Sequence, residues 1–225
     1  MERSLLERVR CPACGTRRWQ LRPDEVATVN YALGSVEEVV SGEVACACGQ
    51  VYPVRDQILS FARVFPEELQ REAAFWDRFY VWNIEHGAEG FHDLKRGFAP
   101  FVAQGVVEPF PFAGTVERYE AHNLVSHHPI FRAGNRLLDL GVGPGWTSLH
   151  FAREGYEVTA LDPSFGPLAA AKRYAIEQGL QIEYLCAAMG YVDFEPASFD
   201  NVTAFHSLHH VPDVRSALSR LAPRD

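Results

Sequence analysis

The sequence predicts an α/β fold in which part of a doubly wound parallel sheet follows a small, β-rich unit that contains cysteines. Three observations support this class: short apolar segments alternate with helix-like segments in the second half, a glycine-rich turn follows the first of them, and two close cysteine pairs stand near the start. The chain has 225 residues, 47% of them hydrophobic, which is enough to bury a substantial core. We expect the cysteine-containing unit at 1–62, a helical linker or lid at 63–130, and the parallel-sheet domain at 131–225.

The first unit is marked by two cysteine pairs, each followed by a glycine: Cys11 and Cys14, and Cys46 and Cys48. Four thiolates grouped in this way can surround zinc tetrahedrally and leave no open coordination position, which predicts a structural metal. The second pair encloses one residue instead of two, so the pattern is less regular. Disulfides or free thiols are the alternatives, and the absence of a signal peptide favours a reducing, cytoplasmic compartment. The fifth cysteine, Cys186, lies in an apolar segment and is expected in the core.

A Tyr-Pro pair follows the second cysteine pair, at Tyr52 and Pro53, within an apolar segment. Together with the cysteines, this segment resembles the Trm112-like zinc ribbons, in which two cysteine knuckles and a Tyr-Pro-hydrophobic strand recur. The resemblance implies that residues 1–62 form a zinc ribbon that holds a structural Zn²⁺.

The linker region begins with a helix signal at 66–68, where a proline is followed by two acids and then by apolar residues at helical spacing. Its aromatic residues Trp76, Phe79 and Trp82 are expected to pack in the core or between the domains, and the alternative is a lid over an acceptor pocket. The segment 97–114 is rich in Pro, Phe and Gly, which predicts a loop or a mobile cover.

The strongest signal for a ligand lies in the parallel-sheet domain, where the apolar run 137–140 leads into a turn with three glycines. Glycine lets the backbone turn tightly and approach a ligand closely. Asp162 ends a second predicted strand about 20 residues on, where a carboxylate can accept hydrogen bonds from ribose hydroxyls. Asp139, just before the turn, would repel a diphosphate but attract an ammonium group. A nucleoside ligand with a cationic end is therefore predicted, and a glycine-rich turn without a ligand is the alternative.

Residues 137–145 read hydrophobic-hydrophobic-Asp-hydrophobic-Gly-x-Gly-x-Gly. This motif resembles that of the class I S-adenosylmethionine-dependent methyltransferases of the methyltransferase type 11 kind, and it implies a Rossmann-like fold that binds S-adenosyl-L-methionine. The cofactor-binding residues that the resemblance implies are Asp139, Gly141, Gly143, Gly145, Asp162, Ala188, Met189 and His206. Ala188 departs from the family, which usually has an acid there to meet the adenine amino group. The adenine would then rest on backbone donors and on apolar contacts such as Met189.

The segment 198–213 resembles the fourth strand of that family and the loop after it, which borders both the cofactor and the acceptor. Its three histidines are candidate general bases, because imidazole ionises near neutral pH: His206, His209 and His210. A packing or turn-capping role is the stronger alternative, since methyl transfer needs proximity and orientation more than it needs acid-base help.

A last helix is predicted over 213–221, shortly before the sequence stops. The family resembled here has seven strands, of which this chain supplies only strands one to four, so we expect a fragment or a truncated reading frame. The fourth strand would then be an open apolar edge that invites pairing with another chain.

These features favour a methyltransferase that acts on a small-molecule, glycan or natural-product acceptor. The runner-up is an rRNA methyltransferase, because the chain also resembles bacterial rRNA guanine methyltransferases that place a zinc finger before this fold; its formal net charge of −8 disfavours RNA. A third interpretation is a non-catalytic module that binds S-adenosylmethionine or a partner, supported by the missing strands and by Ala188. No apolar run is long enough to span a bilayer.

Overall fold

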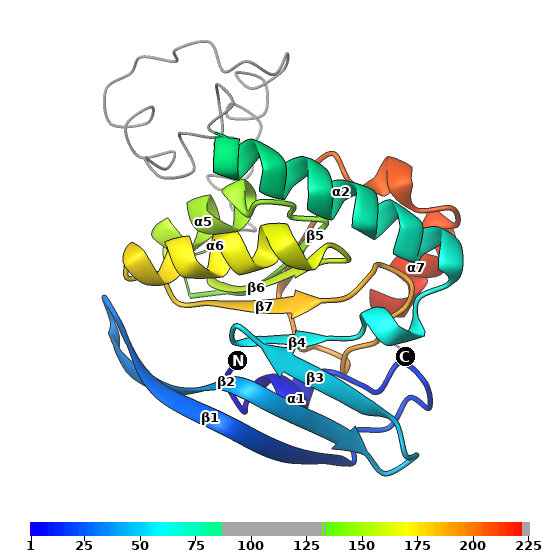
Figure 1. The fold of residues 1–225 in the computed structure, drawn as a ribbon, viewed down its shortest axis with the longest axis horizontal. Helices are drawn as coiled ribbons and strands as arrows, with labels where there is room; N and C mark the ends of the chain where they lie inside the picture. The colour runs from blue at the N-terminus through cyan, green and yellow to red at the C-terminus, as the bar shows by residue number, and fades with distance from the viewer. Residues whose placement is uncertain (87–131, 133, 222–225) are drawn as a thin grey trace.

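The computed structural model describes residues 1–86, 132 and 134–221 (Figure 1). The predicted loop at 97–114, most of the predicted linker and the last four residues lie outside the described part. The side chain of Trp82 also lies outside it, because the last turns of its helix are described by their backbone alone.

Eight strands form one mixed sheet in the described part of the chain, in the order β1-β2-β3-β4-β7-β6-β5-β8. The first four make an antiparallel meander: β1 (Trp19–Tyr31), β2 (Gly34–Cys46), β3 (Val51–Arg55) and β4 (Ile58–Ser60). The other four are parallel: β5 (Arg136–Leu140), β6 (Glu157–Asp162), β7 (Ile182–Cys186) and β8 (Asn201–Thr203). The predicted α/β class and the predicted strands of the parallel half are confirmed.

The meander and the parallel half share one sheet, because β4 pairs with β7 in parallel. Leu59 lies opposite Leu185, Ser60 lies opposite Cys186, and the amide of Phe61 donates to the carbonyl of Cys186 at 2.8 Å. The sequence predicted a β-rich unit before the parallel sheet but did not predict this continuation. The division at residue 62 stays a prediction, and the structure adds that the strands on its two sides are hydrogen-bonded.

Helices cover one face of the parallel strands (Figure 1). They are α5 (Trp146–Arg153) and α6 (Phe165–Glu177), and α2 (Glu67–His86) lies against α6. Asp77 of α2 accepts a hydrogen bond from the amide of Gly166 at 2.7 Å, which fixes α2 at the start of α6. The shorter elements are α1 (Leu5–Arg8), η1 (Ala62–Val64), η3 (Leu208–His210) and α7 (Val214–Leu221). None of the helices in the described part is long and apolar enough to cross a membrane.

Two predicted helix starts are confirmed. The helix signal at 66–68 is followed by α2, whose first turn carries two acids that complement the positive end of the helix dipole. Asp213 caps α7, because its Oδ1 accepts a hydrogen bond from the amide of Ser216 at 2.9 Å.

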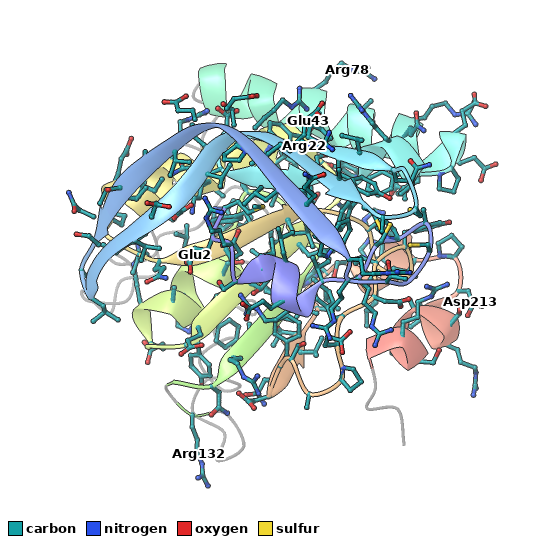
Figure 2. The ribbon with its side chains drawn as sticks, turned by 90° about the horizontal axis from the view of Figure 1, so that it is seen from below. Glu2, Arg22, Glu43, Arg78, Arg132 and Asp213 are labelled. Carbon is teal, nitrogen blue, oxygen red and sulfur yellow. The ribbon has the colours of Figure 1, made fainter. Side chains whose placement is uncertain are left out.

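The other face of the parallel strands is buried against the meander. Leu138, Leu161 and Leu185 belong to a core cluster shared with β2, β3 and α1, whereas their neighbours Leu137 and Val158 pack in a second cluster with α5 and α6. Successive side chains of a strand point to opposite faces, so both faces of the parallel sheet are covered. Seen from below, β1 and β2 arch across the underside of the molecule above α1 (Figure 2). The meander therefore covers one face as the helices cover the other.

A buried ionic cluster also joins the meander to α6. Oε2 of Glu38 in β2 lies 2.8 Å from Nζ of Lys172 and 2.8 Å from the α-amino group of Met1, and all three groups are buried. Tyr31 donates a hydrogen bond to the same carboxylate. Burial alone would raise the pKa of Glu38, but the positive charges of Lys172 and Met1 outweigh it and hold the pKa below its ordinary value. The cluster is thus a charged but internally paired contact.

Strand β8 is an edge in the described part of the chain. It pairs with β5 on one side, and Val202 in its middle is 41% exposed. This is the open edge that the sequence predicted, and a partner chain on it stays a prediction.

Candidate functional site

The glycine turn after β5 requires glycine for two reasons. Gly141, Gly143 and Gly145 have φ angles of +68°, +52° and +85°, in the left-handed region. A Cβ added to Gly141 would lie 2.3 Å from Cβ of Ser207, and one added to Gly145 would lie 2.8 Å from Cβ of Ala171. The turn is therefore packed between the loop after β8 and α6.

Asp162 ends β6 beside this turn. Its Oδ2 accepts a hydrogen bond from the amide of Gly143 and its Oδ1 accepts one from the amide of Ser164, both at 2.8 Å. Burial raises the pKa of Asp162 to about 6, against the effect of these two amides. Each carboxylate oxygen has a second lone pair, so the group can still accept hydrogen bonds from a ligand.

Asp139 at the end of β5 is buried and hydrogen-bonded within the protein. It is 1% exposed, and its carboxylate accepts hydrogen bonds from Thr147, from Ser148 at 2.8 Å and from Thr203 at 3.0 Å. Burial raises its pKa to about 6. Asp139 does not line the cavity described next; it ties β5 to the start of α5 and to β8. Its contact with an ammonium group stays a prediction that this arrangement does not support.

A cavity of about 410 Å³ opens at the carboxyl ends of β5 and β6, where open α/β sheets bind ligands. Four further segments complete it: the loops after β7 and β8, the start of α5, and α2. The predicted site residues that line it are Gly141, Gly143, Asp162, Ala188, Met189, His206, His209 and His210. Gly145 and Asp139 stand behind this lining. The fold thus brings together residues that are spread over 70 positions of the sequence.

Helix α2 forms the outer wall of the cavity. Glu72, Trp76 and Tyr80 follow one another at four-residue intervals and all line it. The rings of Trp76 and Tyr80 are stacked 5.6 Å apart, and a Cβ on Gly143 would lie 3.4 Å from the hydroxyl of Tyr80. Trp76 is half-buried and lines the cavity, outside the fully buried core. Phe79 packs beside Trp76 at 5.6 Å and is not part of the lining.

The three predicted histidines all line the cavity, from the segment that follows β8. His206 has a φ of +53°, an uncommon conformation for a residue other than glycine. The ring of His209 lies 4.0 Å from that of His210, and Nδ1 of His210 lies 2.8 Å from Oε1 of Glu72. Sequence reasoning missed Glu72. The signal that could have found it is the regular spacing of Glu72 with Trp76 and Tyr80.

Four cysteines form a cluster away from the cavity, two of them before β1 and two at or just after the end of β2. The Sγ atoms of Cys11, Cys14, Cys46 and Cys48 all lie within 4.8 Å of one another. The Cys11–Cys48 pair is 3.8 Å apart and the Cys14–Cys46 pair 3.6 Å. Zinc–sulfur bonds of about 2.3 Å place the sulfurs of a tetrahedral site about 3.8 Å apart, whereas a disulfide needs about 2.05 Å. The cluster is therefore compatible with zinc, and the thiols are free. Cys186 is buried in the core, as predicted.

The segment that supplies most of the cavity lining is similar to known proteins. Residues 138–222 match the family described as methyltransferase domain. The ubiquinone biosynthesis O-methyltransferase of Idiomarina loihiensis is 37% identical over 99 residues, which are 44% of this chain and 41% of that protein. The enzyme of the same name from Aeromonas salmonicida is 39% identical over 90 residues, which are 40% of this chain and 38% of that protein. The chain thus spans about two fifths of the length of these relatives.

Two solved structures are also similar. The YcgJ protein of Bacillus subtilis has a TM-score of 0.43 and 28% identity over 48% of this chain and 47% of that one. Magnesium protoporphyrin IX methyltransferase of Synechocystis has a TM-score of 0.46 and 19% identity over 70% of this chain and 72% of that one. By its match in sequence and its Rossmann-like parallel strands, the segment 138–222 of this chain is a methyltransferase domain.

Proposed function

We propose that this protein is a methyltransferase that binds S-adenosyl-L-methionine in the cavity beside the glycine turn and methylates an oxygen atom of a small molecule. The observation that carries the proposal is that the glycine turn, Asp162 and an aromatic wall surround one cavity of about 410 Å³. A cavity of this size is within the range that holds a drug-sized ligand. The match of residues 138–222 to the methyltransferase domain family supports it.

The residues present fit the cofactor. Asp162 already accepts two amides and keeps lone pairs for ribose hydroxyls, as expected of an acid at the end of the second strand. Gly143 leaves its backbone open where a larger residue would meet Tyr80. Ala188 and Met189 supply an apolar surface for the adenine ring. When bound, the cofactor supplies a methyl group that is electrophilic because it is attached to a sulfonium.

The acceptor side of the cavity favours a small, planar molecule. Trp76, Tyr80, Trp146 and Phe205 bring aromatic rings to the lining. Planar groups stack on such rings, whereas a polyanion such as RNA is disfavoured by the net charge of −8. The relatives are named for O-methylation in ubiquinone biosynthesis, which supports oxygen as the acceptor atom. No observation on the described residues favours the rRNA or the non-catalytic interpretation.

The cysteine cluster completes the proposal as a structural zinc site. Cys11, Cys14, Cys46 and Cys48 supply four sulfur ligands, and four sulfurs leave no position for a substrate. The zinc would stabilise the meander, which we interpret as a Trm112-like ribbon. The cytoplasmic location expected from the sequence stays part of this proposal, because a reducing compartment keeps the thiols available for zinc.

Calorimetric titration with S-adenosylhomocysteine tests the cofactor site. We expect Asp162→Ala to weaken binding by about 1–3 kcal/mol, roughly 5- to 150-fold, because hydrogen bonds to an ionised group are lost. Asp24→Ala is the matched control, since Asp24 is exposed on β1 and does not line the cavity. Equal affinity in the wild type and Asp162→Ala would refute the ribose contact, and no binding by the folded wild type would refute the proposed function.

A further inference from the structure

One polar pair in the cavity wall joins two segments that are far apart in the sequence. Glu72 is on α2 and His210 is in η3, and Oε1 of Glu72 lies 2.8 Å from Nδ1 of His210. Their side chains are 37% and 40% exposed, and both line the cavity. The pair is therefore at the surface that a ligand would contact.

The partner of Nδ1 decides which nitrogen of His210 can take a proton. A carboxylate accepts hydrogen bonds and has none to donate, so the contact requires a proton on Nδ1. In the neutral imidazole, Nε2 then carries no proton and has a free lone pair. Glu72 thus selects the tautomer in which Nε2 of His210 is basic. This contact makes His210 a candidate base whose reactive nitrogen is fixed by a neighbour.

Two further rings hold the imidazole in place. Trp76 of α2 contacts His210 edge-on, with ring centres 5.6 Å apart and planes at 88°. The ring of His209 packs at 4.0 Å on the neighbouring position of the loop. Trp76 also lines the cavity, so the wall that would stack an aromatic acceptor is the wall that contacts His210.

Resting on the proposed methyltransferase function, we propose that Glu72 positions His210 as the general base for an aromatic hydroxyl of the acceptor. A bond forms between the hydroxyl oxygen of the acceptor and the methyl carbon, while the bond between that carbon and the sulfur of the donor breaks. The electron pair of the broken bond stays on sulfur, and the hydroxyl proton goes to Nε2 of His210. Glu72 touches neither reacting atom and is a positioning residue.

The chemistry of an imidazole base matches this class of acceptor. A phenol has a pKa of about 10 and is mostly protonated at neutral pH, while an imidazole has a pKa of about 6.5 and can take up its proton as the new bond forms. A carboxylate acceptor is already ionised at neutral pH and needs no base. A dyad of this kind is therefore useful for an aromatic hydroxyl.

Transfer of labelled methyl from S-adenosylmethionine to catechol, measured from pH 6 to pH 10, tests the pair. At pH 7 we expect kcat to fall about 100-fold in His210→Asn and about 10-fold in Glu72→Gln. The double variant should be no slower than His210→Asn, because Glu72 acts through His210. Each loss should shrink toward pH 10, where catechol ionises without a base, and the KM for S-adenosylmethionine should stay within twofold.

Glu68→Gln is the matched control, since it makes the same change one turn earlier on α2, at an exposed position outside the cavity lining. It should keep kcat within twofold. Losses that add in the double variant, or a His210→Asn enzyme with unchanged kcat, would overturn the pair. A wild type that binds S-adenosylhomocysteine but does not methylate catechol would overturn it too, while leaving the proposed function standing. A wild type that does not bind S-adenosylhomocysteine would instead overturn the proposed function.

Discussion

The two faces of the parallel strands are buried by different means. The face that meets α5 and α6 is covered by helices that follow directly in the chain, each packed against the strands beside it. The opposite face is covered by the antiparallel meander, which comes from the early part of the chain. Its outer strands β1 and β2 pair with Arg22 opposite Glu43 (Figure 2).

The meander supports the cavity from behind, although no residue of β1 to β4 lines it. β4 extends the parallel sheet at β7, and the chain runs from β7 directly into Ala188 and Met189 of the cavity wall. Leu185 of β7 is also buried against the meander. A change that loosens the meander should therefore weaken ligand binding at the proposed cofactor site. We test this support by removing, one at a time, the contacts that hold the meander in place.

Removal of the proposed zinc should have the largest effect. Structural zinc contributes about 10–16 kcal/mol in small zinc-binding units, so a strong chelator should melt the meander and uncover one face of the parallel strands. We expect a large fall in the thermal midpoint and the loss of measurable S-adenosylhomocysteine binding in calorimetry. The control is Cys14→Ser/Cys48→Ser, which replaces two exposed ligands. This variant should already show both losses, and the chelator should add nothing. If the chelated wild type keeps its thermal midpoint and its affinity for S-adenosylhomocysteine, the cavity does not depend on the meander.

The buried ion pair between β2 and α6 should have the next largest effect. Lys172→Met leaves the buried carboxylate of Glu38 with the α-amino group of Met1 as its remaining cation. Breaking one partner of a buried pair costs about 3–5 kcal/mol, because a desolvated charge loses its compensation. Urea denaturation measures this as a lower midpoint at unchanged slope.

The control for this pair is Arg173→Met, the same change at the next, exposed position of α6. It should stay within about 0.5 kcal/mol of the wild type. Equal stability of Lys172→Met and Arg173→Met would show that the ion pair between Glu38 and Lys172 does not hold the meander in place.

The parallel strands were easier to predict from the sequence than the way in which the meander joins them. The strands around Asp139 and Asp162 were predictable because each is a short apolar run that ends in a glycine or an acid, and such local signals depend on the residues themselves. The pairing of β4 with β7 was not, since a three-residue strand has no period of its own. The contact of Glu38 with Lys172, 134 positions apart, depends on folding of the whole chain.

The site shows the same limit. The glycine turn, Asp162 and the histidine loop were predictable from a contiguous motif and its resemblance to a family. The wall formed by α2 was not, because Trp76 at helical spacing is equally expected in a core. Glu72 was missed for a related reason: an acid on a helix gives no sign of its partner, and His210 lies 138 positions away.

The smallest of the expected effects concerns pH and a second carboxylate at the junction. Glu183 of β7 is 5% exposed; its Oε2 accepts a hydrogen bond from the amide of Glu2, and its Oε1 has no partner among the described residues. Burial raises its pKa from 4.5 to about 7, although the positive charges of Met1 and Lys172 act in the other direction and Glu38 adds a like charge.

The sign of the effect follows from proton binding. Between pH 4.5 and pH 7 the folded chain keeps a proton on Glu183 that the unfolded chain has released, so this group lowers the free energy of unfolding as the pH rises through that window. The loss should reach about 3–3.5 kcal/mol above pH 7, since each pKa unit corresponds to about 1.4 kcal/mol. Glu183→Gln cannot ionise and should lack this slope, so the difference between the variant and the wild type in urea denaturation should grow from pH 4.5 to pH 7 and then stay constant. Parallel curves would mean that Glu183 titrates alike in both states, and the junction would then tolerate a charge that its burial should exclude.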